Sequence, residues 1–146
     1  MELTTDRLYE TLELVRDVFM EFEAPDYSDE GIEEFLRFLE PVEIAEKLDD
    51  GNMRIWICNS GGEVVGMIAA IENHINLLFV NAMHHRKGIA RRLLEIMIEN
   101  NRPAELTVNS SPYAIEAYKR LGFSETDAEQ VISGIRYTPM RRENPS

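Results

Sequence analysis

The sequence contains only one cysteine, Cys58, among its 146 residues, so it cannot form an internal disulfide. Disulfide scaffolds are therefore excluded, and a reducing, cytoplasmic location is the expectation. No apolar run approaches the ~18 residues that span a bilayer. The first six residues have neither the basic nor the apolar region of a signal peptide. Repeats and Gly/Ser/Pro-rich linkers are absent as well, so we expect one domain over residues 1–146.

Positive charge is scarce, and its distribution is uneven. Residues 1–50 hold 17 acidic and four basic side chains, a net charge of −13, whereas residues 51–146 have a net charge of +1. A nucleic-acid partner is not expected, because binding phosphates needs a basic surface. The acidic half favours a cationic small molecule or peptide as partner, although solvated helix faces explain the same charge.

The first fifty residues have helical periodicity. We predict a helix from an N-cap at Thr5 to about residues 21–23, with one apolar stripe formed by Leu8, Leu12, Val15 and Phe19. A second helix is expected after Ser28, and a short third one over residues 42–48. Only residues 2–4 are left for a strand before the first helix.

From residue 53 the helical period gives way to the alternation of apolar and polar residues that is typical of strands. Strands are predicted at residues 53–58, 63–71, 74–80, 105–108, 123–125 and 134–140. Helices are predicted at residues 86–100 and from Ser111 to Leu121, with Gly122 as the C′ residue. The order indicates an α/β fold that begins with an antiparallel hairpin. The strands at 74–80 and 105–108, joined by a helix, should be parallel neighbours.

The segment after the strand at 74–80 has the chemistry of an anion site. Arg86, Lys87 and Arg91 surround Gly88 and Ala90 at the start of a predicted helix. The first amides of a helix have no internal partner and lie at the positive end of its dipole. Small residues let an anion approach them, so the segment fits a pyrophosphate. A tight turn with ordinary helix packing explains the same residues.

Two motifs together resemble the GCN5-related N-acetyltransferases (GNAT). One is His85-Arg86-Lys87-Gly88-Ile89-Ala90, with His85 where the family usually has Gln or Arg. The other runs from Ala114 through Tyr118 to Gly122-Phe123. The close resemblance covers residues 63–123. It implies a GNAT-like mixed, mostly antiparallel sheet with a central parallel strand pair flanked by helices, and acetyl-CoA as co-substrate.

The resemblance also implies roles for individual residues. The backbone of Leu78, Phe79 and Val80 would pair with the pantetheine arm, and the amide of Phe79 would stabilise the oxyanion. The pyrophosphate would be held by His85, Arg86, Lys87, Gly88, Ile89, Ala90 and Arg91. Asn109 would contact the cofactor arm, and Tyr118 would be the general acid that protonates the thiolate.

The acceptor amine needs a base, for which the sequence offers His74 and Glu72 at the start of one strand. No residues have metal-ligand spacing, so no metal site is expected. The function expected is acetyl transfer to a primary amine of a small molecule or peptide. The alternative is an acyl-CoA-binding sensor or interaction module without turnover. No membrane partner is expected. The strand at residues 134–141 could pair with another chain in a homodimer.

Overall fold

The computed structural model of the protein describes residues 7–144. Its helical segments are α1 (Leu8–Val18), η2 (Phe19–Glu23), η3 (Ala24–Asp26), α2 (Asp29–Phe38), α3 (Pro41–Asp49), η4 (Ala82–His84), α4 (Ile89–Asn101) and α5 (Ile115–Arg120). Its strands are β1 (Arg54–Ser60), β2 (Glu63–Ile71), β3 (His74–Val80), β4 (Glu105–Ser110), β5 (Ser124–Glu125), β6 (Gln130–Ile132) and β7 (Ile135–Glu143). The segment η2 is a single π-helical turn, and η3 and η4 are 3₁₀ turns.

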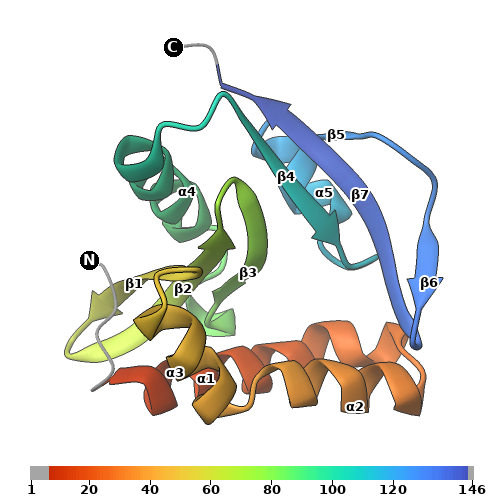
Figure 1. Ribbon diagram of the computed structural model, residues 1–146, viewed down its shortest axis with the longest axis horizontal. Helices are drawn as coiled ribbons and strands as arrows, with labels where there is room; N and C mark the ends of the chain where they lie inside the picture. Colours follow the sequence, from red (N-terminus) through yellow and green to blue (C-terminus); the bar gives the residue numbers. More distant parts are fainter. Residues whose placement is uncertain (1–6, 145–146) are drawn as a thin grey trace.

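The strands form one sheet in the order β1-β2-β3-β4-β7-β5, with β6 paired to β7. Within the described residues, β3 and β4 are parallel and the other neighbours are antiparallel. In Figure 1, β3 and β4 diverge from the point where they meet. The expected mixed, mostly antiparallel sheet with a central parallel pair is therefore confirmed.

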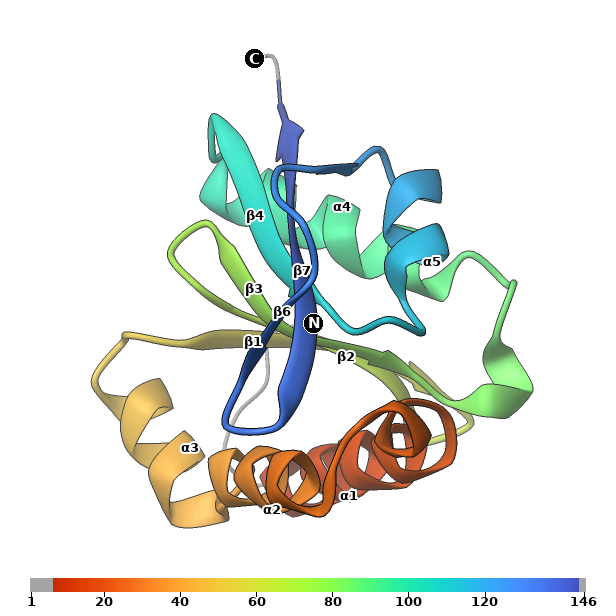
Figure 2. The same ribbon diagram turned by 90° about the vertical axis from the view of Figure 1, so that its right-hand side faces the viewer.

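Helices cover both faces of this sheet, as Figure 2 shows: α1, α2 and α3 lie on one side and α4 and α5 on the other. Each face has its own apolar core. The first includes Val15, Phe19, Ile44, Ile55 and Met67. The second includes Trp56, Ile68, Leu93, Met97 and Leu106. Neighbours such as Met67 and Ile68 enter opposite cores, because side chains along a strand alternate between its faces.

Helix boundaries differ from expectation where the backbone turns sharply. The helix predicted from residue 86 begins at Ile89, because Arg86 and Gly88 have φ values of 65° and 78° and left-handed residues do not continue a right-handed helix. The helix predicted from Ser111 begins at Ile115, after a turn in which the Ser111 hydroxyl accepts from the Ala114 amide at 3.3 Å.

Other predicted residues at the starts and ends of helices are confirmed. The side chain of Ser28 accepts a hydrogen bond from the Gly31 amide at 3.2 Å and caps α2. Gly122 follows α5 with φ 97°. The first helix keeps its apolar stripe, but its α-helical part ends at Val18 and a π-helical turn follows. The predicted N-cap at Thr5, and residues 2–4, the only ones left for a strand before the first helix, lie outside the described residues.

The last strands need one correction. β6 was not predicted, because three residues are too few to show alternation. β7 pairs with β4 along one edge and with β5 and β6 along the other. The homodimer stays a prediction. No helix between residues 7 and 144 combines the length and apolar character needed to cross a membrane.

A β-bulge at Asn76 changes which face of the sheet the side chains of β3 point to. Ala69 pairs with Leu77 and Ala70 pairs with Ile75, so Asn76 has no partner across the ladder. As a result, Ile75 belongs to the core under α4, whereas Leu77 belongs to the core under α1. The bulge lies where β3 leaves β4, and it positions the site described next.

Candidate active site

The site begins as an opening inside the sheet. β3 and β4 are paired only at His74–Thr107 and Ile75–Val108, and beyond these residues the two strands separate. Two cavities occupy the opening. The α4 cavity, about 420 Å³, extends toward the start of α4, and the α2 cavity, about 460 Å³, extends toward α2 and the β6–β7 hairpin. A ligand can therefore enter the sheet from either side.

The two cavities meet at a small group of residues that line both. They are Glu23, Leu78, Phe79, Ala114 and Tyr118. These residues come from η2, β3 and the start of α5, so three elements distant in sequence converge there. We call this group the junction.

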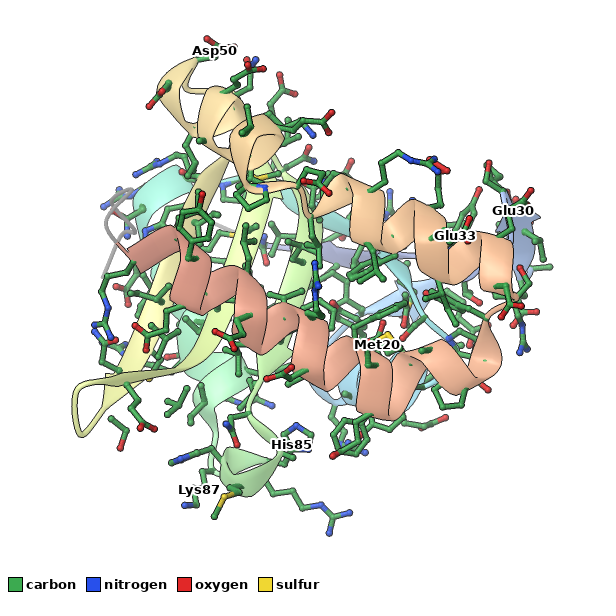
Figure 3. All side chains as sticks on the ribbon, turned by 90° about the horizontal axis from the view of Figure 1, so that it is seen from below. Met20, Glu30, Glu33, Asp50, His85 and Lys87 are labelled. Atoms are coloured by element: carbon green, nitrogen blue, oxygen red, sulfur yellow. The ribbon has the colours of Figure 1, made fainter. Side chains whose placement is uncertain are left out.

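Most of the predicted cofactor residues line the α4 cavity. They are Leu78, Phe79, Val80, His85, Arg86, Gly88, Ile89, Ala90 and Arg91. Lys87 is not among the lining residues, although Figure 3 shows it with His85 on the loop before α4. Asn109 lines the α2 cavity instead. The structure thus brings nine of the eleven predicted residues to one cavity.

Gly88 is the N-cap of α4, and its φ of 78° suits glycine. A Cβ atom added there would meet no atom within 4 Å, so the space before the first amides of α4 is open. The thirteen-residue helix directs its positive end toward this space, and Arg86 and Arg91 line the same cavity. The loop thus has the charge and the access that the sequence predicts for an anion.

Backbone direction along β3 follows from a single hydrogen bond. The Asn81 amide donates to the Val65 carbonyl at 2.8 Å, next to the pair Gly66–Val80. In an antiparallel ladder, alternate residues direct their polar groups to the same neighbour. The backbone N–H and C=O of Phe79 therefore point toward β2, and those of Leu78 and Val80 point toward the opening. The amide of Phe79, expected as the oxyanion donor, is thus directed away from the opening, and the amide of Leu78 is directed toward it.

His85 bonds to this exposed edge. Its Nε2 lies 2.8 Å from the Val80 carbonyl oxygen, which can only accept, so Nε2 carries a proton. The ring also lies 5.2 Å from that of Phe22, which in turn stacks on Tyr113 at 5.1 Å. His85 thus fixes the end of β3 next to the loop of residues 85–88 before α4, which we call the anion loop.

Tyr118 is buried at the junction, packed edge-on against Phe123 at 5.4 Å between ring centroids. Burial raises the pKa of its hydroxyl well above the ordinary value, and the nearby charge of Glu23 raises it further. The phenol therefore stays protonated at neutral pH and can donate to a group in the cavity.

Glu23 was not predicted from the sequence. Burial raises its pKa to about 7, against the opposing effect of a hydrogen bond from Ser111, while the charge of Asp26 raises it further. The sequence did contain a signal, since Glu23 lies four residues after Phe19 and continues the apolar stripe of the first helix. A carboxyl group on an apolar stripe is costly to bury, so the position is a candidate for a functional residue.

The two predicted bases lie in different places. His74 lines the α2 cavity, its Nδ1 lies 2.8 Å from Thr107 Oγ1, and burial lowers its pKa. Glu72 is exposed in the turn between β2 and β3 and lines a third depression, not the junction. Within residues 7–144, no group of three or more His, Cys, Asp or Glu side chains is arranged to hold a metal.

Comparison with known proteins agrees with this geometry. The sequence model of the Acetyltransferase (GNAT) domain matches residues 23–144. The chain belongs to the GNAT family. It is 33% identical over 78 residues to the uncharacterized N-acetyltransferase YafP of Escherichia coli, a match that covers 53% of this chain. The chain spans about half the length of that curated relative, 51% of which is matched.

Solved GNAT structures share the fold along nearly the whole chain. A GNAT protein from Rhodopseudomonas palustris has a TM-score of 0.82 at 20% identity, covering 99% of this chain and 94% of that one. The PaiA N-acetyltransferase of Thermoplasma acidophilum, solved in complex with coenzyme A, has a TM-score of 0.79 at 17% identity, covering 99% and 97%.

Proposed function

We propose that this GNAT protein transfers an acetyl group from acetyl-CoA to a primary amine by direct attack on the thioester. The observation that carries the proposal is the meeting of two cavities at Tyr118, one leading to the anion loop and one leading away from it. A long phosphorylated thioester would lie along the first cavity, and an acceptor would reach the thioester through the second. The coenzyme A complex of the Thermoplasma relative supports this choice of cofactor.

The cofactor would lie along β3. The polar backbone groups of Leu78 and Val80 face the opening and can pair with the two amides of pantetheine, as an added strand would. The free amides at Gly88 and the residues after it would hold the pyrophosphate, with Arg86 and Arg91 adding positive charge. Asn109, across the opening, would contact the arm near its thiol end.

The chemistry is acyl transfer. A neutral amine attacks the thioester carbonyl carbon, a C–N bond forms, and negative charge develops on the carbonyl oxygen. The amide of Leu78 would stabilise that charge. The C–S bond then breaks, its electron pair leaves on sulfur, and the hydroxyl of Tyr118 donates a proton to the thiolate.

The acceptor is proposed to be cationic. Among the described residues that line the α2 cavity there are two carboxylates, Glu23 and Glu34, and no lysine or arginine. Burial lowers the pKa of His74, which favours its neutral form. Six of the other lining residues are aromatic: Tyr27, Phe35, Phe38, Phe79, Tyr118 and Tyr137. Such a wall favours an ammonium group attached to an apolar body, and it disfavours carboxylates.

Substitution of Gly88 tests the cofactor site. In Gly88→Arg the side chain would fill the open space before α4, and we expect acetyl-CoA binding measured by calorimetry to be lost. Gly51→Arg is the control, because Gly51 has nearly the same φ, 76°, equally open surroundings and no place in either cavity. Equal affinity of the Gly88 variant and the unaltered protein would overturn the site assignment.

Turnover is tested by thiol release from acetyl-CoA with a panel of primary amines, including putrescine, phenethylamine and lysine methyl ester, and with the anionic amine glutamate. We expect release with cationic amines and little with glutamate. Tight binding of acetyl-CoA with no release above hydrolysis for any amine would instead support a sensor or interaction module.

A further inference from the structure

Glu23 is the one carboxylate among the five junction residues. It is the last residue of the π-helical turn η2, which begins at the buried Phe19. π-helical turns occur often at functional sites, where they shift the direction of a side chain within a helix. Here the turn delivers a carboxyl group to the place where acceptor and thioester must meet.

The surroundings of Glu23 explain what this carboxyl group can do. Besides burial, the groups that shift its pKa are the hydroxyl of Ser111 and the charge of Asp26, and the charge of Glu23 in turn raises the pKa values of Tyr27 and Tyr118. No cation is among the causes of its pKa shift, and Arg136 from β7 is engaged by Glu129 at 3.1 Å and Asp26 at 3.9 Å. Among the described residues, Glu23 is thus a half-buried carboxylate with no cation paired to it, next to a cavity that suits ammonium groups.

We propose that Glu23 is the general base of the transfer and takes the proton that the acceptor ammonium must lose before it attacks. This inference rests on the proposed acetyl transfer. One proton passes from the ammonium to the Glu23 carboxylate, which keeps it until the thiol has left and then releases it to solvent. The neutral amine attacks, the C–N bond forms and the C–S bond breaks. Sulfur takes the proton of Tyr118, and the second proton lost by nitrogen restores the Tyr118 hydroxyl.

The acid and the base act on each other through their charges. While Glu23 is ionised, its charge makes Tyr118 a weaker acid. When Glu23 takes the amine proton, that charge disappears and Tyr118 becomes a better donor to sulfur. Deprotonation of the acceptor thus prepares protonation of the leaving group, and the order of the two steps follows from electrostatics.

His74 is the competing base, because it also lines the α2 cavity. Unlike Glu23, it does not line the α4 cavity, and its Nδ1 is held at 2.8 Å from Thr107 Oγ1 at the closed end of the opening. Glu23 lies at the junction with Tyr118, where the thioester must be. The experiment therefore compares the two residues directly.

The experiment measures the pH profile of kcat/KM for Glu23→Gln, Glu23→Asp, His74→Gln and the control Glu21→Gln, which changes an exposed carboxyl on the same turn. Phenethylamine and putrescine serve as acceptors, with hydroxylamine as a nucleophile that is already neutral at pH 7. Calorimetry with acetyl-CoA checks that each variant keeps its cofactor site.

We expect Glu23→Gln to lose about 100-fold in kcat/KM with phenethylamine and putrescine at pH 7, and much less with hydroxylamine. It should also lose the rise in rate that the unaltered protein shows near pH 7, while Glu23→Asp keeps part of it and Glu21→Gln all of it. A profile of Glu23→Gln that still rises near pH 7, or loss of that rise in His74→Gln alone, would overturn the inference. Absence of turnover in the unaltered protein would instead refute the proposed function.

Discussion

At the scale of single residues, the hydroxyl of Tyr118 should matter for chemistry and not for cofactor binding. In Tyr118→Phe the ring keeps its edge-on packing against Phe123, so the fold is retained. We expect kcat to fall about 100-fold, because a positioned proton donor is lost, with an unchanged dissociation constant for acetyl-CoA. Tyr113→Phe is the control, since it removes the hydroxyl of a half-exposed ring that lines the same α4 cavity. A fall in kcat with that control as well would argue against the role of Tyr118.

Glu23 should also influence stability. Its pKa in the folded protein is about 7, above the ordinary 4.5, so the folded state binds its proton more tightly than the unfolded state does. The contribution of Glu23 to the free energy of unfolding is therefore fully present below pH 4.5. It is lost as the pH rises to about 7, by at most about 3 kcal/mol. Urea unfolding at pH 5 and pH 8 should show that Glu23→Gln is more stable than the unaltered protein at pH 8, with a smaller difference at pH 5. An equal difference at both pH values, or one matched by Glu21→Gln, would contradict this.

Some of these site residues could be predicted from the sequence, and others could not. Gly88 and Tyr118 stand in motifs whose spacing survives in the sequence, so both could be named in advance. For Glu23 the only signal is its place on the apolar stripe, because its surroundings depend on a π-helical turn and on residues about ninety positions away, such as Ser111 and Tyr118. Glu72 and His74 are two residues apart in sequence, yet the turn after β2 places only His74 in the α2 cavity.

At the scale of elements, the contact between α2 and the β6–β7 hairpin should control the acceptor end of the site. A Cβ at Gly31 would collide with the backbone carbonyl of Gly134, so α2 and the hairpin touch through main-chain atoms. Gly31→Ala should cost about 2 kcal/mol of unfolding free energy, as overpacking does, and raise KM for the acceptor with no change in acetyl-CoA binding. Glu33→Ala, at an exposed position of the same helix, should change neither.

Elements with a strong period were predicted well. The strands β2 and β3 have the predicted bounds, since each is long and bounded by turn residues. The starts of α4 and α5 were placed too early, because the left-handed residues Arg86 and Gly88 and the turn at Ser111 leave no mark on apolar periodicity. The bulge at Asn76 was equally invisible, although it decides which core Ile75 and Leu77 enter.

At the scale of the whole molecule, charge is separated between the acidic helices and the basic loop. In Figure 3, Glu30 and Glu33 lie on α2, away from His85 and Lys87 on the loop before α4. Long-range attraction between the acidic helices and a dicationic acceptor should therefore speed binding of that acceptor. We expect kcat/KM for putrescine to fall as NaCl rises from about 20 to about 200 mM, more than for phenethylamine, because salt shortens the range of such fields.

The double variant Glu30→Gln/Glu33→Gln should weaken this salt dependence. Glu95→Gln/Glu99→Gln is the matched control, because it removes the same charge from exposed positions of α4 on the opposite face of the sheet. Equal effects of the two double variants would show that net charge matters and that its location does not.

The opening between β3 and β4 gives a strand in the middle of the sheet one side without a ladder partner. Solvent deuterium should therefore replace the amide protons of Leu78 and Val80 quickly in the free protein, while that of Phe79, which is bonded to β2, exchanges slowly. Acetyl-CoA should slow the first two and leave the third unchanged, as nuclear magnetic resonance can follow residue by residue. The centre of this sheet thus stays incomplete until the cofactor supplies the missing strand.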